Sequence, residues 1–156
     1  DLRKPVVHRY LKVARIRGKG LTGVLAGAPL ESAIVPVENL SIQVLAADAI
    51  PPNPAELLGS QRMEQVIGQM EQHYDFMIFD TPPVSVVTDA AVLSRYVDGV
   101  LLVVRQNYAA LEQVQLAKRN LEQVHAKILG AVLNQFDAKS ADQDSGYYYS
   151  YQYDYS

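Results

Sequence analysis

F-M-I-F-D-T-P-P, residues 76–83, is the stretch of sequence that decides how this chain folds. Four apolar residues in a row are typical of a strand that is buried on both faces of a parallel sheet. Asp80 follows at the carboxyl end, where open α/β sheets bind ligands, so it is well placed to hold a metal ion through water. Pro82 and Pro83 lack N–H groups and fix the backbone, so the chain leaves the strand stiffly. The alternative is that Asp80 is only a turn residue that ends the strand.

Outward from this stretch, apolar patterns predict an alternation of strands and helices. We expect strands at 40–45, 75–80, 99–104 and 128–133, and helices at 54–72, 88–96 and 111–124. The first helix carries the clearest start signal: Asn53 as N-cap, Pro54 at the first helical position and Glu56 at the third, as in a capping box. The alternation predicts an α/β fold, a parallel sheet with helices on both faces. Residues 6–13 and part of 18–27 are expected to add short helical turns.

Composition indicates one globular domain followed by a tail. The chain has 156 residues, is 49% hydrophobic and carries a formal net charge of −3, which suits a domain with a substantial core. It has no cysteine, which excludes disulfides and thiolate catalysis. We expect a folded domain at 1–137 and a flexible tail at 138–156, where aliphatic residues are replaced by polar ones and tyrosines.

Two residue types are unevenly distributed. Half of the 14 lysines and arginines precede Gly20, and six of the ten tyrosines fall in the last ten residues. The basic residues are Arg3, Lys4, Arg9, Lys12, Arg15, Arg17 and Lys19, and the tyrosines are Tyr147, Tyr148, Tyr149, Tyr151, Tyr153 and Tyr155. We interpret most of the basic residues as a solvated face, except Arg3 and Lys4, which adjoin the acid Asp1. The alternative is that the basic opening faces acidic tails or nucleotide phosphates. The tyrosines suit phosphorylation, which would add about −1.5 to −2 charges each, or else form a self-associating aromatic patch.

Taken together, these motifs resemble the bacterial tyrosine kinases of capsule and exopolysaccharide synthesis. The matching segments are D-L-R-K-P, P-P-N-P-A-E-L-L, Y-D-F-M-I-F-D-T-P-P-V, T-D-A, D-G-V-L-L-V-V-R and L-G-A-V-L-N, followed by the tyrosine cluster. The resemblance covers nearly the whole chain in the family's order. It implies a P-loop NTPase-like fold and an ATP-dependent autokinase that regulates polysaccharide synthesis and export.

The resemblance also implies roles for particular residues. Asp80 would be the Walker B acid that holds Mg²⁺ through its water shell, with Thr81 and Pro82 beside the nucleotide. Asp1 matches the second aspartate of the family's other acidic motif and would serve catalysis and the metal. Arg3 and Asn134 would contact the nucleotide, Asn134 at the adenine ring. The six tail tyrosines would be autophosphorylated between subunits of a ring.

One departure from the family pattern limits these expectations. No segment matches G-x-x-x-x-G-K-[ST], the loop that cradles phosphates. The chain also begins without methionine, so we expect it to be the C-terminal part of a kinase, lacking that loop and inactive alone. The alternatives are a partitioning-type ATPase of the MinD/ParA kind and, for the chain as given, a phosphoacceptor or interaction module without catalysis.

The resemblance extends to partners and location. It implies a membrane adaptor of the polysaccharide co-polymerase type, either separate or fused, a cognate tyrosine phosphatase and a homo-oligomeric ring. It implies no nucleic acid partner. The protein is expected in the cytoplasm, at the inner face of the plasma membrane through its adaptor.

Overall fold

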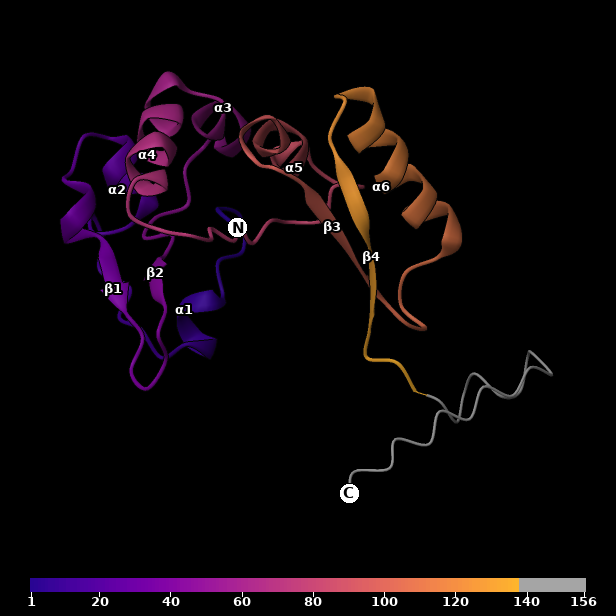
Figure 1. The fold of residues 1–156 in the computed structure, drawn as a ribbon, viewed down its shortest axis with the longest axis horizontal. Helices are drawn as coiled ribbons and strands as arrows, with labels where there is room; N and C mark the ends of the chain where they lie inside the picture. Colours follow the sequence, from indigo (N-terminus) through magenta and orange to yellow (C-terminus); the bar gives the residue numbers. More distant parts are fainter. Residues whose placement is uncertain (138–156) are drawn as a thin grey trace.

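The computed structural model describes residues 1–137 and arranges them in two groups of elements (Figure 1). The first group contains α1 (Val7–Tyr10), α2 (Leu21–Leu25), β1 (Ile34–Pro36), β2 (Gln43–Leu45), α3 (Pro54–Leu58) and α4 (Gln61–Glu71). The second contains α5 (Asp89–Leu93), β3 (Val100–Arg105), α6 (Leu111–Gln123) and β4 (Ile128–Asn134). Single turns of 3-10 helix lie at Leu30–Ser32 and Ser94–Tyr96. The N-terminus lies between the two groups.

The parallel pair β3–β4 confirms the predicted βαβ unit at the end of the chain. The two strands pair in register from Leu101 opposite Gly130 to Arg105 opposite Asn134. Helix α6 connects them and covers one face of the pair (Figure 1), with Ala117 and Leu121 buried. Leu111 and Val124 are exposed, because they lie at the two ends of the helix.

The prediction of a buried strand at 75–80 is wrong for the described part of the chain. Residues 76–80 have no regular secondary structure and pair with no strand among residues 1–137. The side chains nevertheless alternate as in an extended chain: Met77 and Phe79 pack against the core, whereas Phe76 is 89% and Ile78 96% exposed. A parallel strand is stable only with neighbours on its edges and layers on both faces, and these are absent here.

The strand expected at 40–45 is also shorter and differently paired. β2 covers Gln43–Leu45 and forms an antiparallel hairpin with β1, which the sequence did not predict. The two sheets are separate and have two strands each. The expected four-stranded parallel sheet is therefore reduced to the β3–β4 pair within residues 1–137. β2 is antiparallel to β1 because the connection between them is short.

The long helix expected at 54–72 is broken in two at Gly59 and Ser60. α3 begins at Pro54 as predicted, but the Asn53 side chain donates to Glu56 Oε2 (3.1 Å) and caps no backbone N–H group. Ser60 is the effective N-cap of α4, because its hydroxyl accepts from the Met63 N–H at 3.2 Å. The break turns α4 so that its apolar face, Met63, Val66 and Ile67, becomes buried.

The hydrophobic core lies around α4, and a buried acid, Asp48, binds backbone N–H groups near α2. The core residues are Leu2, Val24, Leu25, Leu30, Ala33, Leu58, Met63, Val66, Ile67 and Leu93. Asp48 is 8% exposed and accepts hydrogen bonds from the N–H groups of Gly18 (2.7 Å) and Gly23 (3.2 Å). One carboxylate thus fixes both ends of the segment that leads into α2. No helix in the described range is both long and apolar enough to cross a bilayer.

We predict that Asp48→Ala destabilises the chain by about 1–3 kcal/mol, because two backbone N–H groups lose a buried acceptor. Urea unfolding followed by circular dichroism measures this difference. Glu122→Ala is the matched control: Glu122 pairs with Lys118 on the surface of α6 (3.4 Å), and such a pair contributes about 0.5 kcal/mol or less. Equal midpoints for the two variants would contradict the role given to Asp48.

A second prediction concerns the uncovered stretch 76–80. Ile78→Ser should change the stability of this chain by less than about 0.5 kcal/mol, since the side chain is almost fully exposed. Met63→Ala removes a side chain that is 1% exposed and should cost about 2–5 kcal/mol. The same urea titration compares them. A large loss for Ile78→Ser would mean that this stretch is covered in solution.

Candidate functional site

The structure brings the two predicted acids, Asp1 and Asp80, to one place. The Asp1 amino group donates to the main-chain oxygen of Asp80 (2.5 Å) and lies 3.8 Å from Asp80 Oδ2. Burial lowers the pKa of this amino group, while the carboxylates of Asp80 and Asp89 act in the opposite direction. The side chain of Asp1 is largely covered, whereas that of Asp80 is more than half exposed. Asp80 is therefore the acid with open access to solvent.

The carboxylate of Asp1 shapes the loop that carries it. Its Oδ1 atom accepts from the backbone N–H groups of Arg3 (2.7 Å) and Lys4 (3.0 Å). These two bonds curl residues 1–4 into a tight turn. The neighbouring Leu2 is buried in the core, so the turn is attached to the rest of the molecule from its inner side.

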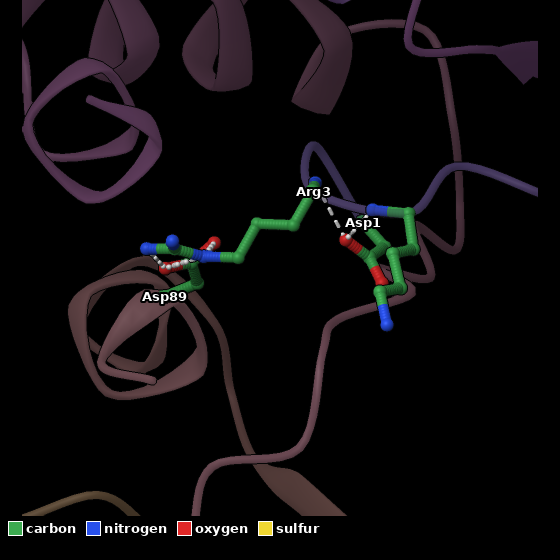
Figure 2. A network of polar contacts seen from close by, with 4 residues as sticks. Asp1, Arg3 and Asp89 are labelled. Carbon is green, nitrogen blue, oxygen red and sulfur yellow. Dashed lines mark hydrogen bonds and ion pairs between the residues drawn. The ribbon is translucent and has the colours of Figure 1, made fainter. Parts of the chain in front are cut away.

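Arg3 connects this turn to helix α5. Figure 2 shows its side chain extending from the loop of Asp1 to the carboxylate of Asp89. Arg3 Nε lies 3.1 Å from both Asp89 oxygens, and Nη2 lies 2.7 Å from Oδ1. The Asp89 side chain is fully buried. Hydrogen bonding to Asp89 raises the pKa of the Arg3 guanidinium further above its usual value, so this cation stays charged.

Asp89 is the site residue that the sequence analysis missed. Its T-D-A motif was noted only as part of a resemblance, and an acid at the start of a helix is ordinarily explained by the helix dipole. Two features of the sequence could have pointed to Asp89: it follows the predicted helix start at Thr88, and Arg3 had no acidic partner assigned to it. Nothing in the sequence indicates that these two residues, 86 positions apart, meet.

A cleft of about 950 Å³ lies beside the acids. Its polar edge includes Asp1, Asp80, Thr81, Pro82 and Asp89, and most of its remaining wall is apolar and comes from the first eleven residues, the β1–β2 hairpin and residues 73–79. Arg3 reaches Asp89 at this edge. The site residues expected near the start of the chain and after residue 79 are thus brought together.

Asn134 lies elsewhere, at the carboxyl end of β4, and is not among the residues that line this cleft. Its side-chain oxygen accepts from the Gln135 N–H (2.9 Å), and its main-chain oxygen accepts from the Gln106 N–H (3.1 Å). The expected contact with adenine stays a prediction. The six tail tyrosines lie outside the described residues.

The two acids fit a hydrated magnesium ion better than a closed metal site. Residues 1–137 contain no group of three or more His, Cys, Asp or Glu side chains that could hold a metal. Mg²⁺ commonly uses one or two carboxylates and keeps several water ligands. Asp80 is open to solvent, and Oδ2 of Asp1 accepts no hydrogen bond from the described chain, so both can face such an ion.

Comparison with known proteins places the chain among kinases. No protein-family model matches it. It is 38% identical over 149 residues to the tyrosine-protein kinase YwqD of Bacillus subtilis, covering 95% of this chain and 62% of YwqD. It is 38% identical over 135 residues to the tyrosine-protein kinase Etk of Escherichia coli, covering 86% of this chain and 18% of Etk. The chain thus spans less than two thirds of the length of these relatives.

Solved structures agree with this placement. The kinase domain of E. coli Etk superposes with a TM-score of 0.83 at 36% identity, covering 98% of this chain and 58% of that domain. The VpsO kinase domain gives a TM-score of 0.79 at 31% identity, covering 88% of this chain and 68% of the other. Sequence and fold agree over nearly all of the described residues, and the chain belongs to the family of bacterial tyrosine-protein kinases.

Proposed function

We propose that this chain is the C-terminal part of an ATP-dependent tyrosine autokinase of P-loop NTPase type that regulates capsular or exopolysaccharide synthesis and export. The observation that carries this proposal is the fixed approach of the Asp1 loop to Asp80 at the edge of one cleft. Family membership supports the reaction type. The tyrosine-rich end of the sequence supports autophosphorylation at Tyr147, Tyr148, Tyr149, Tyr151, Tyr153 and Tyr155.

Each site residue then has a physical task. Bound Mg²⁺·ATP supplies the phosphoryl group and neutralises charge that develops during its transfer. Asp80 would hold the ion through water, and Asp1 would be the second acid beside it. Arg3 is tied to Asp89, so its main task is to hold the turn that carries Asp1. Transfer would form a bond between a tyrosine oxygen and the γ-phosphorus, break the bond to ADP and release the tyrosine proton, for which the carboxylate of Asp1 or Asp80 would be the acceptor.

Two observations support a phosphate-binding loop supplied by a segment other than residues 1–156. The sequence contains no G-x-x-x-x-G-K-[ST] motif, and the stretch leading to Asp80 leaves Phe76 and Ile78 exposed. Strands paired along the edges of this stretch, with a layer of helices on its open face, would cover both side chains and bring further residues to the carboxyl edge where Asp80 lies. The chain alone is then a poor kinase, because positioning and charge neutralisation supply most of the catalysis of phosphoryl transfer.

The lack of a G-x-x-x-x-G-K-[ST] motif also favours a second candidate function: the chain as given would act as a phosphoacceptor and interaction module. The partitioning-type ATPase receives no support from the relatives named above. The kinase proposal includes several partners and a location: a membrane adaptor, a ring of subunits, a cognate tyrosine phosphatase and the inner face of the plasma membrane. It includes no nucleic acid partner.

We predict that the chain incubated with Mg²⁺ and ATP keeps its intact mass, and that addition of the E. coli Etk kinase domain produces a ladder of up to six phosphates. Intact-mass spectrometry measures both. The matched variants replace either the six tail tyrosines or the two most exposed body tyrosines, Tyr10 and Tyr108, by phenylalanine. Only the tail variant should lose the ladder. A ladder from the chain alone would contradict a missing phosphate cradle, and no ladder in either mixture would contradict the tail as substrate.

We also predict that Asp89→Asn in the full-length protein lowers the rate of autophosphorylation by about ten- to hundredfold, since a small displacement of the turn carrying Asp1 is costly. Quench-flow or timed immunoblots with a phosphotyrosine antibody measure the rate. Arg3→Lys should fall between Asp89→Asn and the wild type, because lysine keeps the charge but not the two-pronged geometry. Lys118→Ala on α6 is the control, and a rate for Asp89→Asn equal to the control's would refute the positioning role.

A further inference from the structure

Five cations stand together in the segment that follows the site. We define the basic arm as Arg9, Lys12, Arg15, Arg17 and Lys19, all exposed. Within the described chain, none of their side chains has an ion pair or a hydrogen bond to another side chain. No acidic residue occurs between Leu2 and Leu30. Two acids from elsewhere in the chain lie beside the arm: Asp48 binds the Gly18 N–H, and Glu38 lines a small hollow together with Lys12. The arm is therefore a concentration of positive charge in which five cations stand against two carboxylates.

The backbone of the basic arm is held in a defined shape. The Val13 N–H donates to His8 O (3.0 Å), and the Lys19 N–H donates to Ile16 O (2.9 Å). Asp48 binds the N–H of Gly18, between the last two cations. Cations on a fixed backbone lose less conformational entropy on binding an anion than cations on a free chain. This distinguishes the arm from an unstructured basic stretch.

Several other cations of the described chain have internal partners. Arg3 is bonded to buried Asp89, Arg95 donates to the main-chain oxygen of Gly59 (2.8 Å), and Lys118 pairs with Glu122. The basic arm thus differs from these in having anion-binding capacity that the described chain does not use. Its ligand should be a multivalent anion that can contact several guanidinium and ammonium groups at once.

The chain itself contains a segment that becomes such an anion. Residues 138–156 carry Asp142, Asp144 and Asp154 against a single cation, Lys139, together with the six tyrosines. Each phosphotyrosine adds about −1.5 to −2 charges and three strong acceptor oxygens. Because this segment is covalently joined to the body, its docking on the arm of the same chain is an intramolecular event.

We propose that the basic arm is a docking site for the phosphorylated tail, residues 138–156, of this chain. This inference rests on the proposed function only in requiring that the tail be phosphorylated. Leu11, between the first two cations of the arm, lines the cleft, so a tail docked at this end of the arm lies beside it. Docking then retains the product of autophosphorylation beside the site and competes with the entry of an unmodified tail.

The test uses the full chain in its unphosphorylated form and two fluorescein-labelled synthetic peptides of residues 138–156, one with six phosphotyrosines and one with none. Fluorescence anisotropy at low ionic strength gives both affinities. The phosphopeptide should bind at least about tenfold more tightly than the plain peptide, and added salt should weaken it, because exposed charge pairs are screened. Equal affinities for the two peptides would overturn the proposal. Since the peptides are synthetic, binding is measured whether or not the protein phosphorylates its own tail.

Charge-reversal variants locate the site. Arg15→Glu with Arg17→Glu should weaken phosphopeptide binding about tenfold or more, and Arg15→Gln with Arg17→Gln should weaken it less. Arg119→Glu with Lys127→Glu changes the net charge equally on an exposed region of the second group of elements and should have little effect. Equal weakening by both reversals would show a net-charge effect and refute a site.

A third probe separates the tail from a lipid surface. Vesicles of phosphatidylglycerol and phosphatidylcholine offer the same kind of anionic group without the peptide. Cosedimentation that depends on Arg15 and Arg17, together with no binding of the phosphopeptide, would overturn the tail as ligand and assign the arm to membranes. Circular dichroism of each variant confirms that the fold is retained.

Discussion

The buried charge of Asp89 is the constraint on which the candidate site depends. A carboxylate without access to water needs a cation with matching geometry, and the two-pronged guanidinium of Arg3 supplies it. Satisfying this need draws the start of the chain onto α5, and the hydrogen bonds of Asp1 to the following N–H groups then fix where that acid lies. The position of Asp1 beside Asp80 is thus a consequence of an ion pair on the other side of the turn.

A second constraint on the site comes from the apolar stretch before Asp80. The stretch before Asp80 is as apolar as a strand buried on two faces, but within residues 1–137 it has a core on one face only. Met77 and Phe79 pack against the core and hold this stretch extended. Phe76 and Ile78 therefore point away from the core and stay exposed to solvent, at a cost in hydrophobic free energy. Within residues 1–137 the position of Asp80 is therefore set by packing on one face of this stretch.

Sequence patterns predicted those elements whose stabilising contacts are local. Helix α6 and the strands β3 and β4 were predicted to within one or two residues, because one βαβ unit contains all their partners. The strand at 75–80 was wrong because its apolar run specifies burial but not what buries it. The break at Ser60 was missed because a strong start signal at Asn53 and Pro54 concealed a second cap. Of the site, Asp1 and Asp80 were predicted, whereas Asp89 depends on a contact that no local pattern records.

The distribution of charge follows a related logic. The two buried acids of the described chain are both satisfied, Asp89 by Arg3 and Asp48 by the N–H groups of Gly18 and Gly23. Five exposed cations without an ion pair are concentrated in the basic arm, and six of the ten tyrosines are concentrated at the opposite end of the sequence. In such a molecule phosphorylation changes the interaction between two segments far more than the stability of either, because the charge is added outside the packed core and opposite a surface already of the other sign.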